Sequence, residues 1–278
     1  MSVPGGAVRR VGDKSEKKGV IMATLVVPGA RLHHAVTGSG PVLLCVPGGA
    51  ADSGMFAQIA GPLAEHYTVV TYDPRGISRS PLDDPGEEQR IEVHADDALR
   101  LLDSVGTEPA LIFASSGGCM QAFDLVARHP GRVRTLVAHE PPLTALLPEQ
   151  PDVDPDELLY IYREHGIEAA IGKFMADAGF EGPEGGFPPE MAKNFEFFIV
   201  HLMKAIGSFT PDYSALKASG TRIVAGVGET SAGQPAHEAA VLAAGKLGVE
   251  PTYFPGDHGG FASDATAFAL RLREALDV

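Results

Sequence analysis

Cysteine is scarce in this chain: only two of its 278 residues, Cys45 and Cys119, are of this type, and they lie far apart. Each adjoins an apolar run, so we expect two small buried thiols and no disulfide framework. Basic side chains are also few, since 22 Lys and Arg stand against 36 Asp and Glu, for a net charge of −14. This negative field repels phosphate backbones and anionic lipids, so we expect neither a nucleic acid nor a membrane as a partner.

Long hydrophobic runs are absent as well. The first twenty residues hold five basic side chains but no apolar stretch of the kind that a secretory signal requires. No run elsewhere approaches the length of a membrane-spanning helix. We therefore expect a cytoplasmic protein with a flexible N-terminal extension over residues 1–22, in which Met22 is an alternative natural start.

Two kinds of cofactor signature are missing. None of the ten histidines pairs with another at a convincing metal-ligand spacing, and the adjacent His33 and His34 on a predicted strand must point to opposite faces. No Gly-x-Gly-x-x-Gly follows the first predicted strand, so a dinucleotide site is not indicated. We predict a protein that works without a metal ion or a cofactor.

What the chain has is a regular alternation of short β-branched runs with helical patterns, and 44% hydrophobic residues to bury. Eight strands are predicted, at residues 24–27, 32–37, 42–46, 68–72, 110–113, 133–139, 222–227 and 252–254. Helical patterns occupy residues 55–66, 89–105, 119–128, 235–247 and 264–276. This alternation predicts an α/β fold with an eight-stranded, mainly parallel sheet and helices on both faces.

One segment breaks the rhythm, between residues 141 and 220. Loops rich in proline and glycine there separate helical patterns over 157–164 and 191–206. An insertion of this kind after a strand predicts a helical cap over the carboxyl edge of the sheet. Residues 23–140 and 221–278 would then form the core domain.

The predicted cap contains several large apolar side chains, including Phe195, Phe198 and Met203. Such residues either pack against the main domain or line a substrate pocket. We assign these three to substrate binding, with packing as the alternative.

A strained corner between strand and helix is indicated by Ala114-Ser115-Ser116-Gly117-Gly118, which follows the apolar run 110–113. A nucleophile at such a corner requires small residues two positions before and two positions after it. For Ser116 these are Ala114 and Gly118, whereas Ser115 would place a phenylalanine in the crowded position. Ser116 is therefore the predicted nucleophile. Cys119 would fall on the helix, and a plain turn is the alternative without chemistry.

A serine needs a base within hydrogen-bond reach to remove its proton. His258 is the candidate, because it lies in a glycine-rich loop after the last predicted strand; a surface histidine in a turn is the alternative. The attack creates an oxyanion, which needs two donors already in place. We expect one to be the N–H of Gly117 and the other to come from the loop at 47–50.

Taken in order, these features resemble the α/β-hydrolase superfamily over nearly the whole chain from Thr24 onward. Pro47-Gly48-Gly49 stands where many members have His-Gly-x, which implies that Gly49 carries the second oxyanion N–H. Residues 73–80, Asp-Pro-Arg-Gly-Ile-Ser-Arg-Ser, are similar to the family's Asp-x-Arg-Gly-x-Gly-x-Ser loop, with Ser78 in place of a glycine. The elbow and the late histidine complete the set.

The resemblance leaves the catalytic acid in an unusual place. Many members carry it three residues after a glycine that ends the penultimate strand, where this chain has Ser231. Zearalenone-type lactonases and some haloalkane dehalogenases instead have a glutamate just after the sixth strand, and this chain has Glu140 there. The similarity implies that Glu140 is the acid. Glu229, Asp73 and Asp257 are the competing carboxylates.

Ser116, His258 and Glu140 would together hydrolyse an ester or lactone of a neutral, hydrophobic small molecule, and the placement of the acid favours lactones. A serine at the elbow excludes the alkyl-ester intermediate of the relatives that use aspartate there. C–C bond hydrolysis, acyl transfer and perhydrolysis use the same residues, and a ligand-binding protein without turnover also stays open. We predict a small-molecule substrate as partner and leave a homodimer open.

Overall fold

The computed structural model describes residues 19–149, 153–180 and 187–277. Residues 1–18 of the predicted N-terminal extension and the predicted loop at 182–186 lie outside these ranges. Ile21 and Met22 belong to the first strand, which therefore starts earlier than the sequence pattern predicted. Among the described residues, no helix is both long enough and apolar enough to cross a membrane.

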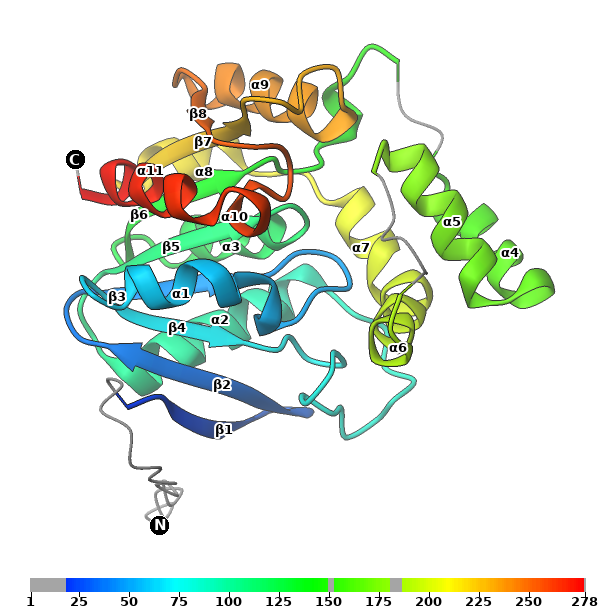
Figure 1. Ribbon diagram of the computed structural model, residues 1–278, viewed down its shortest axis with the longest axis horizontal. Helices are drawn as coiled ribbons and strands as arrows, with labels where there is room; N and C mark the ends of the chain where they lie inside the picture. Colours follow the sequence, from blue (N-terminus) through cyan, green and yellow to red (C-terminus); the bar gives the residue numbers. More distant parts are fainter. Residues whose placement is uncertain (1–18, 150–152, 181–186, 278) are drawn as a thin grey trace.

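An eight-stranded, mainly parallel sheet forms the centre of the protein, in the order β1-β2-β4-β3-β5-β6-β7-β8 (Figure 1). The strands are β1 (Ile21–Val27), β2 (Ala30–Gly38), β3 (Val42–Val46), β4 (Thr68–Tyr72), β5 (Ala110–Ser115), β6 (Val133–His139), β7 (Arg222–Gly228) and β8 (Thr252–Phe254). Only β2 runs against its neighbours, β1 and β4. All eight predicted strands are confirmed, and the fold class with them.

Parallel pairing brings the carboxyl ends of the central strands to one edge of the sheet. Val46 at the end of β3 lies beside Ala114, and Ser115 at the end of β5 lies beside His139. His139 in turn pairs with Gly226 on β7. Residues that follow these strands therefore come together in space although they are far apart in the sequence.

Helices cover both faces of the sheet (Figure 1). The short η1 (Ser53–Phe56) and the helices α1 (Ala57–Leu63), α10 (Gly260–Ser263) and α11 (Ala265–Asp277) cover one face. The other face is covered by α2 (Ile91–Val105), α3 (Gly118–Arg128), α8 (Tyr213–Ala218) and α9 (Pro235–Leu247).

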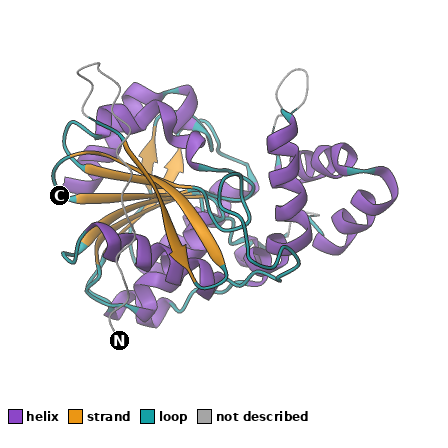
Figure 2. Cartoon of the chain, turned by 90° about the horizontal axis from the view of Figure 1, so that it is seen from below, coloured by secondary structure: helices purple, strands orange, loops and turns teal. Residues whose placement is uncertain are grey.

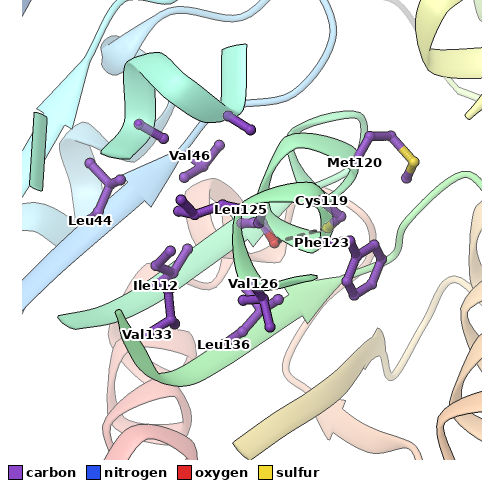
Figure 3. Packing of buried hydrophobic residues seen from close by; sticks show 14 of the residues in the cluster. Leu44, Val46, Ile112, Cys119, Met120, Phe123, Leu125, Val126, Val133 and Leu136 are labelled. Carbon is purple, nitrogen blue, oxygen red and sulfur yellow. Dashed lines mark hydrogen bonds between the residues drawn. The ribbon is translucent and has the colours of Figure 1, made fainter. Parts of the chain in front are cut away.

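The core against α3 shows why the central strands are so apolar. Side chains of α3 such as Leu125 and Val126 lie among those of the strands, including Ile112 on β5 and Leu136 on β6 (Figure 3). All four side chains are fully buried, and burying one of this size stabilises the fold by about 1.5–3 kcal/mol. The strands are covered on both faces, so they read as continuous apolar runs.

A group of helices between β6 and β7 stands beyond the carboxyl edge of the sheet (Figure 2). Its members are α4 (Pro155–His165), α5 (Ile167–Ala178), α6 (Pro189–Phe197), the π-helical turn η3 (Phe198–Leu202) and α7 (Met203–Ser208). They share their own apolar cluster, and we call them the helical layer. The next helix, α8, instead buries Leu216 in the main core. The chain around η2 (Thr144–Leu146) also packs on the main core, where it buries Leu143.

Candidate active site

Ser116 occupies a strained turn between β5 and α3. Its φ angle is 52°, in the left-handed region that side chains other than glycine rarely adopt. Two backbone hydrogen bonds hold it there: its N–H donates to the carbonyl of His139 and its carbonyl accepts from Cys119, each at 2.9 Å. This is the geometry of a nucleophile elbow.

Glycines let the loop after β3 approach the elbow closely. A Cβ atom on Gly118 would lie 2.5 Å from the carbonyl oxygen of Pro47, and one on Gly48 would lie 2.8 Å from the Cβ of Ser116. A Cβ on Gly117 would come within 3.2 Å of the amide nitrogen of Gly49. The two amides predicted to bind an oxyanion therefore belong to adjoining backbone segments, beside Ser116.

Neighbouring residues that could compete with Ser116 are buried. The hydroxyl of Ser115 is enclosed and has no hydrogen-bond partner among the described residues. Cys119 is a free buried thiol whose Sγ points to the carbonyl of Ala114 at 3.3 Å. Burial raises the pKa of this thiol far above its ordinary value, so it stays protonated. Cys45 is likewise buried and free.

His258 and Glu140 meet at the same edge of the sheet. His258 lies in the loop between β8 and α10, with its side chain 18% exposed, and its Nδ1 is 2.7 Å from Oε2 of the fully buried Glu140. Glu140 directly follows β6 and has a φ of 47°, which is the second case of left-handed strain at this edge. Its N–H donates to the carbonyl of Gly226, which anchors the strained residue to β7.

The second carboxylate oxygen of Glu140 is also bonded. Oε1 accepts from the N–H of Gly228 at 2.8 Å and from the hydroxyl of Ser231. Burial alone would raise the pKa of Glu140, but the hydrogen bond from His258, the electrostatic interaction with the rings of His139 and His258, and the hydrogen bond from Ser231 lower it to about 2. Glu140 is thus an anion at neutral pH. Its hydrogen-bond donors come from Gly228 at the end of β7, from Ser231 in the loop after β7, and from His258.

The three competing carboxylates lie in other surroundings. Glu229 is exposed, and Asp257 is exposed and accepts from the N–H of Gly259. Asp73 is buried, and although burial works to raise its pKa, hydrogen bonds from Arg79 and Ser53 lower it below the ordinary value. Among the described residues, the side chain of His258 forms its hydrogen bond with Glu140 and with none of these three carboxylates.

A cavity of about 130 Å³ lies between Ser116 and the helical layer. Its lining by described residues is almost entirely apolar, and Ser116 and Thr144 are the polar side chains among them. The lining residues are Gly49, Ser116, Gly117, Pro142, Thr144, Val153, Pro155, Phe174, Ala178, Phe180, Phe198, Met203, Ile206, Gly207, Pro235 and Ala236.

Two of the three predicted substrate-binding residues, Phe198 and Met203, line this cavity. The π-helical turn η3 explains how both do so. In a regular α-helix, side chains five residues apart diverge by about 140°, whereas here the N–H of Met203 bonds to the carbonyl of Phe198 across a wider turn. Phe195 does not line the cavity, because its ring packs among Phe174 and Phe187 inside the helical layer.

Sequence reasoning missed Phe174 and Phe180. Phe174 lies on α5, a helix that was not predicted although Gly166 and Gly179 bracket it and its apolar residues recur at helical spacing. Phe180 lies with its ring centroid 4.7 Å from that of His258. It borders both the cavity and an adjacent surface hollow that His258 lines. No sequence pattern connects Phe180 with His258.

His139, at the end of β6 directly before Glu140, does not line the cavity. It is fully buried on the sheet face that α1 and α11 cover, among Phe113, Phe254 and Phe268. Burial lowers its pKa to about 3, so the ring is neutral. It packs as part of an aromatic cluster.

The residue that departs from the family loop, Ser78, has a φ of 47°, which explains why glycine is usual at that position. Its hydroxyl donates to Asp52 at 2.6 Å and accepts from the side-chain amide of the buried Asn194 on α6. Ser78 therefore connects the helical layer to the segment that follows the glycine loop 47–50. Within the part of the chain that the structure covers, no cluster of three or more His, Cys, Asp or Glu could hold a metal ion.

Comparisons with known proteins agree with this architecture. Residues 41–197 match the family described as the alpha/beta hydrolase fold. The uncharacterized hydrolase YraK of Bacillus subtilis (strain 168) is 35% identical over 258 residues, which cover 91% of this chain and 95% of the relative.

Two further similarities are more distant. Zearalenone hydrolase of Bionectria ochroleuca is 27% identical over 128 residues, or 45% of this chain and 48% of that protein. Among solved structures, Est816, described as an N-acyl homoserine lactone degrading enzyme, has a TM-score of 0.70 at 20% identity, over 91% of this chain and 99% of that one. At this identity the likeness concerns the fold alone.

Proposed function

Since this chain belongs to the alpha/beta hydrolase fold family, we propose that it is a serine hydrolase that cleaves an ester or lactone of a neutral, apolar small molecule. One observation carries the proposal: the 2.7 Å contact between His258 and Glu140 lies at the sheet edge where Ser116 sits in a strained turn. A buried anion on one imidazole nitrogen leaves the other nitrogen to act as a base.

In the first half of the reaction, Nε2 of His258 takes the proton of Ser116 as its Oγ attacks the carbonyl carbon. Glu140 fixes the tautomer with the proton on Nδ1 and stabilises the imidazolium that forms. The N–H groups of Gly49 and Gly117 receive the oxyanion. The leaving alkoxide then takes the proton from His258, which leaves an acyl group on Ser116.

In the second half, water enters, loses a proton to His258 and attacks the acyl carbon, and the tetrahedral species collapses to release Ser116, whose Oγ takes that proton back from His258. With a lactone, the alcohol and the acid are parts of one molecule, so a single hydroxy acid leaves. The chemistry at Ser116 is the same for an ester.

The substrate class follows from the cavity. None of the described residues that line it carries a charge, and burying a charged substrate against this apolar surface would cost its hydration. The described activity of Est816 toward a lactone supports a lactone as one form of the substrate, as does the position of Glu140 after β6. An acyclic apolar ester fits the same surroundings.

The test combines a panel of p-nitrophenyl esters and macrocyclic lactones with covalent labelling by a fluorophosphonate. We expect Ser116→Ala to abolish both turnover and labelling, with little change in the thermal melt. Ser115→Ala is the matched control, since Ser115 is buried, and should keep most activity. Labelled peptides that map to Ser115 or Cys119 would overturn the proposal. Absence of labelling in the wild type would point to a ligand-binding protein instead.

A further inference from the structure

A second histidine lies close to the carboxylate of Glu140. His237 is the third residue of α9, is only 5% exposed, and has its Nδ1 3.0 Å from the hydroxyl oxygen of Ser231 and 3.6 Å from Oε1 of Glu140. Ser231 in turn bonds to that same Oε1. The elements involved, β6, β7 and α9, adjoin one another (Figure 1).

The protons available on these groups determine which group donates and which accepts in each hydrogen bond. The carboxylate of Glu140 can only accept, so the single proton of Ser231 is donated to Oε1. The carbonyl of Gly228 is a longer alternative acceptor for that proton, at 3.3 Å. With its proton committed, the Ser231 oxygen can only accept from His237, which therefore carries a hydrogen on Nδ1. The bonds run from His237 to Ser231 to Glu140.

We propose that His237 and Ser231 are positioning residues that hold Glu140 in the orientation in which Oε2 meets His258. The proposal rests on the proposed function, since it concerns how that triad is assembled. One carboxylate would thus be held on both sides, by His258 at Oε2 and by the pair from the β7–α9 segment at Oε1.

The chemistry of glutamate explains why such support is needed. A glutamate side chain has one more rotatable bond than an aspartate, so more rotamer freedom must be suppressed to fix its carboxylate. The N–H of Gly228 supplies one restraint on Oε1. Ser231 supplies a second, and His237 prevents its hydroxyl from turning to another acceptor.

The experiment compares two substitutions of His237. His237→Phe keeps a buried ring but removes the donor, and we expect kcat for a p-nitrophenyl ester to fall about ten- to a hundredfold, the effect of losing one hydrogen bond to a charged network. KM should change less than about twofold, because His237 does not line the cavity. His237→Asn, which keeps an N–H near the position of Nδ1, should restore most of kcat.

Two further variants separate positioning from folding. Ser231→Ala should lower kcat by a similar factor, and the double variant Ser231→Ala/His237→Phe should be no worse than Ser231→Ala, because both residues act through one bond. His34→Phe is the control for replacing a buried histidine, since His34 lies on β2 away from Glu140. Fluorophosphonate labelling of Ser116 should slow in parallel with kcat.

The outcomes are distinguishable. If the wild type is labelled at Ser116 and turns over ester, but Ser231→Ala and His237→Phe keep its kcat, the positioning role is wrong and the proposed function stands. If His237→Asn is as impaired as His237→Phe while Ser231→Ala is active, the histidine acts by packing and the proposal also falls. A wild type without labelling or turnover would refute the proposed function itself.

Discussion

Left-handed backbone conformations occur at three non-glycine residues among those described: Ser78, Ser116 and Glu140. Each costs about 1–2 kcal/mol relative to a relaxed conformation. Ser116 and Glu140 are the proposed nucleophile and acid, and Ser78 links the helical layer to the core. The strained backbone conformations therefore occur at residues of the proposed site and at the residue that joins the helical layer to the core.

Glu140 should be indispensable for turnover and Glu229 dispensable. Loss of the carboxylate leaves the imidazole in the wrong tautomer with its cation unstabilised, which in serine hydrolases costs up to about ten-thousandfold in kcat. We expect a loss of that order for Glu140→Gln and wild-type kcat for Glu229→Gln, because Glu229 is exposed and the described hydrogen bond of His258 is to Glu140. Steady-state kinetics, with folding checked by circular dichroism, decides. The reverse result would move the acid to the conventional loop.

At Ser78, the free-energy cost of the strained backbone can be compared with the stabilisation from the hydrogen bonds of its hydroxyl. Ser78→Gly removes the strain but also the two bonds of the hydroxyl, to Asp52 and from the side-chain NH₂ of Asn194, and keeps the backbone N–H bond to Asn194. Because a bond to a charged group contributes about 1.5–3 kcal/mol, we expect a net loss of about 1–2 kcal/mol. Ser78→Ala keeps the strain and loses the same bonds, so it should be less stable still. Urea unfolding measures both, and a Ser78→Gly variant more stable than wild type would show that strain dominates.

The sequence predicts those residues of the proposed site that lie in local motifs, and not those that depend on contacts between distant elements. Ser116, Gly49, Gly117 and His258 lie in local motifs, so their order along the chain pointed to one edge of the sheet. Glu140 required comparison with relatives, because its role depends on a neighbouring strand. Ser231 and His237 carry no motif; their contact with Glu140 exists only once β6, β7 and α9 adjoin.

The helical layer between β6 and β7 is the element where prediction from sequence was weakest. The buried parallel strands read as apolar runs and were found with small errors at their ends. In the layer, the helices bury only one side, and the π-helical turn η3 shifts the pattern by one residue after Phe198, so a regular helical periodicity does not place Phe198 and Met203 at the same cavity. Its limits also differ from the predicted 141–220, since α8 packs on the main core.

Within the layer, Met203 and Phe195 should respond differently to truncation. Met203→Ala enlarges the cavity and should change KM and the preferred acyl size, with little effect on phosphonate labelling. Phe195→Ala removes a buried ring that packs against other rings and should lower the free energy of unfolding by about 3–5 kcal/mol. Kinetics on esters of increasing acyl length and thermal melts distinguish them. If both variants only melt earlier, the substrate binds elsewhere.

At the scale of the whole molecule, acid stability should depend on Glu140. Its pKa is about 2 in the folded protein against an ordinary 4.5. A carboxyl group with a lower pKa in the folded chain favours folding above pH 4.5, and that contribution is lost as the pH falls from 4.5 toward 2. We expect the advantage of wild type over Glu140→Gln to shrink over this window, by about 3 kcal/mol at most. Urea unfolding at pH 6 and pH 3.5 measures it; a constant difference would contradict the lowered pKa.

The whole enzyme should also need no dissociable cofactor. The proposed reaction uses only side chains and amides of this chain, so ester turnover should survive EDTA and exhaustive dialysis. Activity is measured before and after treatment, with a zinc-dependent esterase as the positive control for chelation. Loss of turnover that a divalent metal ion restores would contradict this expectation and bring the histidines back into question.

Ser116 and Glu140 both precede the helical layer along the chain, and His258 follows it. A recombination that exchanges only the helical layer, from α4 to α7, would therefore bring in a new pocket lining while leaving the proposed nucleophile, base and acid in the host gene. The incoming segment must replace the polar contacts of the layer with the core: the side chain of Asn194, which bonds to both the N–H and the hydroxyl of Ser78, and the carbonyl of His201, which accepts from the N–H of Gln89. Substrate range and reaction type can thus be inherited separately, as two blocks of sequence joined by a few polar contacts.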